Sequence, residues 1–125
     1  MTLNRKQLGA EGEERASLYL QEQGYIILQR NWRCSSGELD IIASKDNQLV
    51  FVEVRTRTVY AQGSGVNRYG SVLEAITPRK QIQLRRLAEI YLYQAKLRNI
   101  SLRFDVVLVE RSGEQYSMNH IKHAF

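Results

Sequence analysis

The chain has 125 residues, of which 43% are hydrophobic and 25% charged, and its formal net charge is +5 at pH 7. This length and composition suit a single folded domain, residues 1–125, and exclude an intrinsically disordered chain. No apolar run approaches the roughly 20 residues that cross a bilayer, and the N-terminus lacks the apolar core of a signal peptide. We therefore expect a cytoplasmic protein with no membrane partner.

The charge is divided unevenly along the chain. The segment from Arg55 to Arg103 holds 10 Lys and Arg residues against 2 acidic ones, whereas residues 1–54 hold 8 acidic residues against 6 basic ones. Clustered Lys and Arg gain affinity for nucleic acids by releasing counterions from phosphate backbones. The basic middle therefore favours a nucleic-acid partner, although a solvated basic helix would give the same count.

The first third of the chain is predicted to form a helix followed by strands. Apolar residues recur at helical spacing over Arg5–Gln23, and Gly24 supplies a stop. The run Tyr25–Leu28 predicts a first strand that extends toward Trp32.

Two alternating runs then predict a hairpin, because polar turn residues separate Glu38–Ala43 from Leu49–Arg55. The glycine-rich stretch Thr56–Ser71 predicts a long mobile loop.

Thr77 and Pro78 predict the start of a second helix, which should end near Asn99. Two further strands are expected at Leu102–Val109 and Gln115–Lys122. The predicted fold class is α/β (α+β), with a mixed central sheet flanked by helices in the order α-β-β-β-α-β-β.

The hairpin brings two acidic side chains together. A turn centred on Asp46 and Asn47 pairs residues whose numbers sum to 93, so Asp40 faces Glu53. Opposed Cβ atoms lie roughly 4.5–5.5 Å apart, close enough for two carboxylates to share a cation. Oxygen ligands without an obligatory His or Cys favour Mg²⁺ or Mn²⁺, ions that assist phosphodiester hydrolysis.

Further candidates surround this pair. The same register puts Glu38 opposite Arg55 on the carboxylate face and assigns the other face to Leu39, Ile41, Val52 and Val54. Helical spacing places Glu13 at the rim of the interior and points Lys80 toward the sheet. The side chains expected to meet phosphates are Arg57, Arg68, Arg79 and Arg86.

Longer motifs carry a resemblance over nearly the whole chain. They are Gly9-x-x-Gly12-Glu13, Asn31-Trp-Arg33, Gly37-Glu-Leu-Asp-Ile-Ile42, Phe51-Val-Glu-Val-Arg-Thr-Arg57, Glu74-Ala-Ile76 with Lys80, and Arg103-Phe-Asp-Val-Val107. Together they resemble the bacterial YraN family, which is similar to restriction-endonuclease-like proteins and Holliday-junction resolvases. The resemblance implies a restriction-endonuclease-like core and an Asp, then Glu-x-Lys, site for Mg²⁺, with Asp40 and Glu53 as metal ligands.

One residue departs from that pattern, because Arg55 stands where Glu-x-Lys has its lysine. Arginine stays protonated and cannot act as a general base, but it can stabilise charge on a phosphate. Three explanations stay open: the lysine is dispensable, Lys80 replaces it, or the site is weakened.

The leading hypothesis is a metal-dependent nuclease acting on DNA, including branched or repair intermediates. Its catalytic residues would be Asp40, Glu53, Arg55, Glu38, Glu13 and Lys80, and a homodimer is plausible by resemblance. The alternatives are a noncatalytic nucleic-acid-binding module of the same fold and a protein-interaction adaptor.

Two histidines and one aspartate are also interpreted from their positions in the predicted strands. His120 and His123 are expected to be exposed on opposite faces of an edge strand. Asp105, in an apolar strand, is either a structural acid paired with an arginine or a further site residue, and the pattern favours the structural role.

Overall fold

The computed structural model describes residues 3–59 and 76–125. In chain order the elements are α1 (Arg5–Glu22), β1 (Ile26–Cys34), β2 (Gly37–Lys45), β3 (Gln48–Thr58), α3 (Pro78–Ala95), β4 (Ser101–Ser112) and β5 (Gln115–Ile121). The five strands form one sheet in the order β1-β2-β3-β4-β5, with β3 parallel to β4 and the other neighbours antiparallel. The predicted mixed class and element order are confirmed. Within the described ranges, no helix is long and apolar enough to span a membrane.

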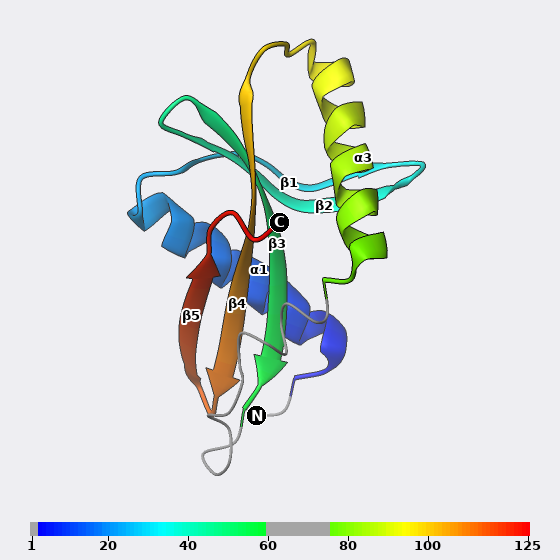
Figure 1. Ribbon diagram of the computed structural model, residues 1–125. Coiled ribbons are helices and arrows are strands. Elements are labelled where there is room, and N and C mark those ends of the chain that lie inside the picture. The colour runs from blue at the N-terminus through cyan, green and yellow to red at the C-terminus, as the bar shows by residue number, and fades with distance from the viewer. Residues whose placement is uncertain (1–2, 60–75) are drawn as a thin grey trace.

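The two helices cover opposite faces of the sheet (Figure 1). Ala16 and Leu20 of α1 are fully buried in one apolar cluster with residues of β2, β3 and β4. Leu84 and Leu87 of α3 are buried in the other cluster, which includes Phe51. Each face needs its own helix because successive strand residues point to opposite sides of a sheet.

Local signals fix where the helices begin. Asn4 and Gln7 form a capping box at the start of α1, with Gln7 N–H donating to Asn4 Oδ1 at 2.8 Å. At the start of α3, Lys80 N–H donates to the Thr77 hydroxyl at 3.1 Å, and Pro78 occupies the first helical position. This second start is the one that the sequence predicts.

The predicted β2–β3 turn is confirmed, and the structure shows it to be a two-residue connection. Asp46 and Asn47 both have positive φ, 49° and 62°, which is the conformation that matches the twist of a tight hairpin. The pairs that follow, from Lys45↔Gln48 to Ile41↔Val52, keep the predicted register.

Two predicted boundaries are wrong. The loop was expected from Thr56, but β3 continues to Thr58 because it pairs with β4 as far as Thr58↔Arg111. Residues 60–71 of that predicted loop lie outside the described residues. The second helix ends at Ala95 rather than near Asn99, because Lys96 adopts a left-handed backbone with φ 57° that closes the helix.

One predicted face is also wrong. Leu39 was expected beside Ile41, yet it packs in the α3-side cluster while Ile41 packs in the α1-side cluster. The β2–β3 pairing ends at Ile41↔Val52, and β2 continues paired to β1 through Trp32↔Leu39. Strict alternation across β2 therefore fails where the strand leaves β3.

Candidate metal centre

Asp40 lies where β2 separates from β3. Its Oδ2 accepts a hydrogen bond from Val54 N–H at 2.9 Å, just beyond the last main-chain pair of the two strands. The Asp40 carboxylate thus replaces a main-chain carbonyl as the acceptor for the Val54 N–H group, at the point where β2 and β3 separate. Asp40 and Glu53 line the same cleft, and each carboxylate acts on the pKa of the other, so the two predicted ligands lie close together.

Three carboxylates converge from two elements. Single carboxylate oxygens of Glu13 on α1 and of Glu38 and Asp40 on β2 all lie within 4.8 Å of one another. The close approach of α1 depends on Gly12, because a Cβ at that position would overlap the hydroxyl of Thr56 on β3. Glu13 is therefore placed by its glycine neighbour as well as by helical spacing.

Asn31 connects two of these carboxylates. With its amide oriented to satisfy both, its nitrogen donates to Glu13 Oε1 at 2.9 Å and to Glu38 Oε1 at 3.0 Å. Asn31 lies within β1 but has φ 52°, a left-handed conformation that is uncommon for residues other than glycine. No strand pattern in the sequence signals such a residue, so its role was missed.

The carboxylates raise one another's pKa values. Burial, and then the charge of Asp40, raise the pKa of Glu53 to about 7, against the lowering effect of Lys80 and Arg55. Burial also raises the pKa of Asp40, and burial together with the Asp40 charge raises that of Glu13. A group of ionised carboxylates in this position is unfavourable without a compensating cation.

Two basic side chains reach Glu53. Arg55 Nη2 lies 3.1 Å from Glu53 Oε2, and Lys80 Nζ lies 3.8 Å from the same oxygen. Lys80 points toward the sheet as predicted. The expected Arg55–Glu38 pairing is replaced by two other ion pairs, because Glu38 Oε2 lies 3.0 Å from Arg33 Nε.

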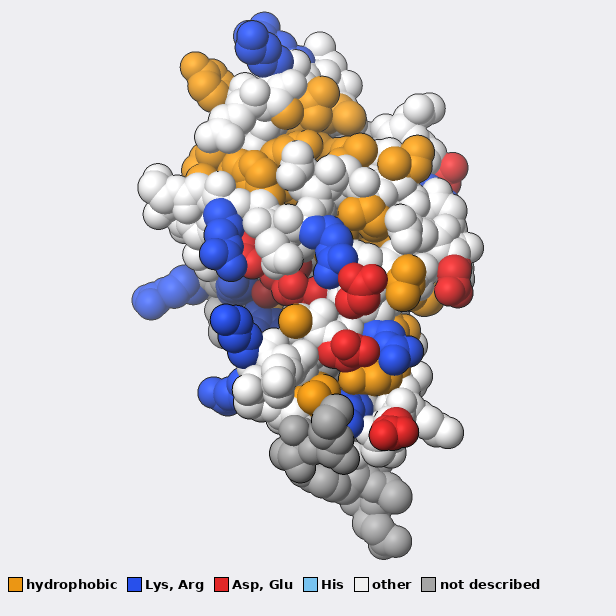
Figure 2. Space-filling view, turned by 180° about the vertical axis from the view of Figure 1, so that it is seen from behind, with side chains coloured by type: hydrophobic (Ala, Val, Ile, Leu, Met, Phe, Trp, Pro, Cys, Tyr) orange, Lys and Arg blue, Asp and Glu red, His pale blue; other side chains and the backbone are white. Residues whose placement is uncertain are grey.

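The cluster opens onto a cleft of about 380 Å³ between α1 and β3. Its lining residues are Arg5, Leu8, Gly9, Glu13, Asp40, Glu53, Val54, Arg55 and Thr56. The space-filling view shows acidic side chains gathered on one face with Lys and Arg side chains close by (Figure 2). A polar ligand can therefore reach the carboxylates from solvent.

The remaining predicted arginines occupy different surroundings. Arg57 Nε donates to Glu110 Oε2 at 3.0 Å, so it neutralises a buried carboxylate next to the sheet. Arg79 and Arg86 are exposed on α3, as predicted. Arg68 lies outside the described residues.

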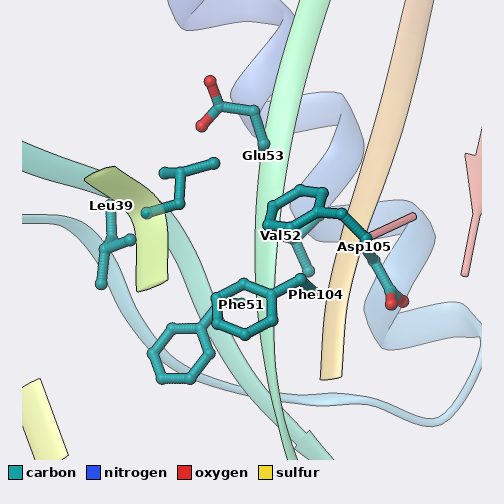
Figure 3. A pocket seen from close by; sticks show the side chains of 8 residues that line it. Leu39, Phe51, Val52, Glu53, Phe104 and Asp105 are labelled. Atoms are coloured by element: carbon teal, nitrogen blue, oxygen red, sulfur yellow. The ribbon is translucent and has the colours of Figure 1, made fainter. Parts of the chain in front are cut away.

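A second polar cluster lies across the sheet from Glu53. Figure 3 shows Asp105 on β4 and Glu53 on β3 with carboxylates directed away from each other. Asp105 accepts two hydrogen bonds of 2.9 Å from Arg103 and lies 2.7 Å from His120 Nε2. Burial opposes ionisation, but hydrogen bonds from His120, Arg103 and the His123 N–H lower the pKa of Asp105.

The predicted Asp105–arginine pair therefore forms, and the predicted exposure of His120 is wrong. The His120 side chain is only 4% exposed. Its Nδ1 lies 3.2 Å from the hydroxyl of Tyr19 on α1. The helix covers this edge strand, which the spacing of residues within β5 could not indicate.

The fold is α+β, and its carboxylate cluster lies where β2 and β3 separate. The chain belongs to the uncharacterised protein family UPF0102, whose model matches residues 12–109. This is the YraN family that the sequence motifs resemble.

Relatives from distant bacteria match almost end to end. The chain is 44% identical to a UPF0102 protein of Caldicellulosiruptor saccharolyticus, covering 98% of this chain and 100% of the relative. It is 41% identical to one of Moorella thermoacetica, covering 100% of both chains. It is 43% identical to one of Mycolicibacterium vanbaalenii, covering 97% of this chain and 95% of the relative.

Proposed function

We propose that this chain is a metal-dependent nuclease that hydrolyses phosphodiester bonds in DNA, with branched and repair intermediates as candidate substrates. The observation that carries the proposal is the convergence of carboxylates from three elements, Glu13 on α1, Asp40 on β2 and Glu53 on β3, at an open cleft. The basic segment from Arg55 to Arg103 supplies charge for a polyanionic substrate.

The residues present fit Mg²⁺ or Mn²⁺. The donors are all carboxylate oxygens, three of them within 4.8 Å of one another, and hard divalent cations prefer such ligands. Burial, and then neighbouring carboxylates, raise their pKa values, so their ionised forms are disfavoured and a bound cation would stabilise them. When bound, such an ion would activate a water molecule and offset charge on the phosphate.

Each side chain then has a defined task. Asp40 and Glu53 would hold the ion, and Glu13 and Glu38 would assist from the same cluster. Lys80 and Arg55, already within 3.8 Å and 3.1 Å of Glu53, stabilise negative charge on the phosphate. Arg55 stays protonated, so it contributes charge and not proton transfer.

A specific observation favours the alternative of a noncatalytic nucleic-acid-binding module. Both cations contact the same oxygen, Glu53 Oε2, and so compete with a metal ion for that ligand. In such a module, Lys80 and Arg55 would permanently neutralise Glu53 and the fold would serve binding alone.

Metal-dependent cleavage separates the two functions. We would incubate labelled branched and linear DNA with Mg²⁺ or Mn²⁺ and compare wild type, Asp40→Asn and Asp46→Asn, prepared identically. Asp46 is an exposed acid in the β2–β3 turn and serves as the matched control. The proposal predicts cutting by wild type and Asp46→Asn but not by Asp40→Asn. Equal cutting by all three, or none by folded protein, would contradict it.

A further inference from the structure

We propose that the groove between α3 and the β1–β2 turn binds the backbone of the nucleic-acid strand next to the scissile phosphate. This inference rests on the proposed function, because the proposed carboxylate site determines the direction in which the bound strand runs. The groove is separate from the cleft at Asp40. Its volume is about 210 Å³, and its lining residues are Ser36, Arg79, Ile82, Gln83, Arg86 and Leu87.

The chemistry of the lining suits a phosphodiester. Arg79 and Arg86 are exposed, and among the described residues no carboxylate forms an ion pair with either. The Gln83 amide and the Ser36 hydroxyl add neutral donors between them. Guanidinium groups, amides and hydroxyls are the groups that bind backbone phosphates and sugars without reading sequence.

The groove has a fixed shape because the turn packs closely on the helix. A Cβ at Gly37 would lie 3.0 Å from Gln83 Nε2 and 3.3 Å from Leu87 Cδ1, and Gly37 has φ 145°. A side chain at this position would be strained by the positive φ and would displace the side chains of Gln83 and Leu87. Glycine therefore keeps the two walls in contact.

Each wall of the groove contains a residue that is close in the sequence to a residue of the carboxylate site. On α3, Arg79 precedes Lys80, whose Nζ lies 3.8 Å from Glu53 Oε2. On the other wall, Ser36 lies two residues before Glu38, which belongs to the carboxylate cluster. A strand held in the groove would thus continue toward Glu53 and Glu38.

The spacing of the arginines fits more than one phosphate. Arg79 and Arg86 are seven residues apart, which corresponds to about 10 Å along a helix with a rise of 1.5 Å per residue. Phosphates of one strand are about 3.4 Å apart along the axis of a DNA duplex. The two arginines are therefore far enough apart to contact different phosphates of one strand, with Gln83 and Ser36 in the same groove.

The test measures binding separately from cleavage. Fluorescence anisotropy of labelled DNA would be recorded in EDTA at several KCl concentrations, for wild type, Arg79→Gln/Arg86→Gln and Arg98→Gln. Arg98 is an exposed arginine beyond the C-terminal end of α3 and is the matched control. Circular dichroism would confirm that each variant is folded.

Removing two phosphate contacts should lower the slope of log affinity against log salt concentration by about 2, because each contact contributes about 0.9. Arg98→Gln should leave the slope at the wild-type value. An unchanged slope in the double variant, or wild-type protein that binds no DNA, would overturn the inference. Cleavage is measured separately. DNA binding that depends on Arg79 and Arg86, without any cleavage, would therefore contradict the nuclease proposal and support the binding groove.

Discussion

At the scale of single residues, Glu53 couples the stability of the fold to the proposed metal. Its carboxylate is 8% exposed and its pKa is raised to about 7 from 4.5, first by burial and then by Asp40. Because the folded state prefers the protonated form, this stabilisation is present below about pH 4.5 and is lost as the pH rises through 7. Asp40 and Glu13, whose pKa values are also raised, act in the same direction.

We therefore expect the metal-free protein to lose roughly 1–3 kcal/mol of unfolding free energy between pH 5 and pH 8, since one pKa unit corresponds to about 1.4 kcal/mol. Urea unfolding in EDTA would measure this loss. Glu53→Gln should reduce the pH dependence, whereas Glu89→Gln, a change at an exposed glutamate of α3, should not. An unfolding free energy of the wild type that does not change with pH would show that ionising Glu53 costs the folded protein little free energy.

Asn31 offers a way to separate backbone strain from carboxylate positioning. Asn31→Gly removes the amide that donates to Glu13 and Glu38, yet glycine adopts φ 52° without steric cost. We expect the variant to fold and to bind Mn²⁺ on the order of 10-fold more weakly, as when groups that orient metal ligands are removed. Calorimetric titration with Mn²⁺ would measure this, and unchanged affinity would mean that the amide does not position the ligands.

Sequence patterns predicted some of these residues and not others, for physical reasons. Asp40 and Glu53 could be paired because turn geometry and a period of two determine the register of a hairpin. Asn31 could not be found, because its part depends on a left-handed residue inside a strand. His120 was misplaced because its burial depends on α1, which is remote in the sequence.

At the scale of elements, the site exists because α1 lies directly against β3. Gly12 permits that contact, whereas Gly9, one turn earlier, has no atom within 4 Å of an added Cβ. Gly12→Ala should therefore destabilise the protein by roughly 1–3 kcal/mol through overpacking and should move Glu13 away from Asp40. Gly9→Ala should be neutral or stabilising, because alanine favours helices.

Urea unfolding of the two variants would test this contact. A second change, Thr56→Gly in the Gly12→Ala background, should restore part of the lost stability because it removes the overlapping side chain. Equal effects of the two alanine substitutions would contradict the account of how α1 is held.

Two departures from the predicted elements have a common cause, which is pairing between remote segments. β3 extends to Thr58 because β4 continues beside it, and Leu39 changes face because β2 leaves β3 and follows β1. Hydrophobic periodicity reports local patterns and contains no information on where a neighbouring strand ends.

At the scale of the whole molecule, the fold contains two polar clusters with different tasks, and α1 contributes to both. The cluster at Asp40 is open to a cleft, whereas Asp105 is 0% exposed and fully engaged by Arg103, His120 and the His123 N–H. In the first cluster Arg55 and Lys80 reach only Glu53 among the described residues, whereas in the second cluster Arg103 directly compensates Asp105. Only the cluster at Asp40 should bind a divalent metal ion.

Asp105→Asn should therefore cost about 3–5 kcal/mol of stability, because Arg103 would remain as an incompletely compensated charge. The pKa of Asp105 is lowered, so the stability that its ionised form contributes is present above its ordinary pKa of 3.8 and is lost on acidification below it. Denaturant unfolding would measure the first effect and acid unfolding the second. A variant as stable as wild type would show that the cluster is dispensable.

The central claim is that carboxylates from α1, β2 and β3 form a divalent-metal centre, and Mn²⁺ titration followed by calorimetry tests it most directly. Wild type and Asp46→Asn should bind Mn²⁺ with the same affinity, and Asp40→Asn and Glu53→Gln should each bind at least 10-fold more weakly while remaining folded. Equal Mn²⁺ binding by all four proteins, or none by the wild type at neutral pH, would contradict the claim.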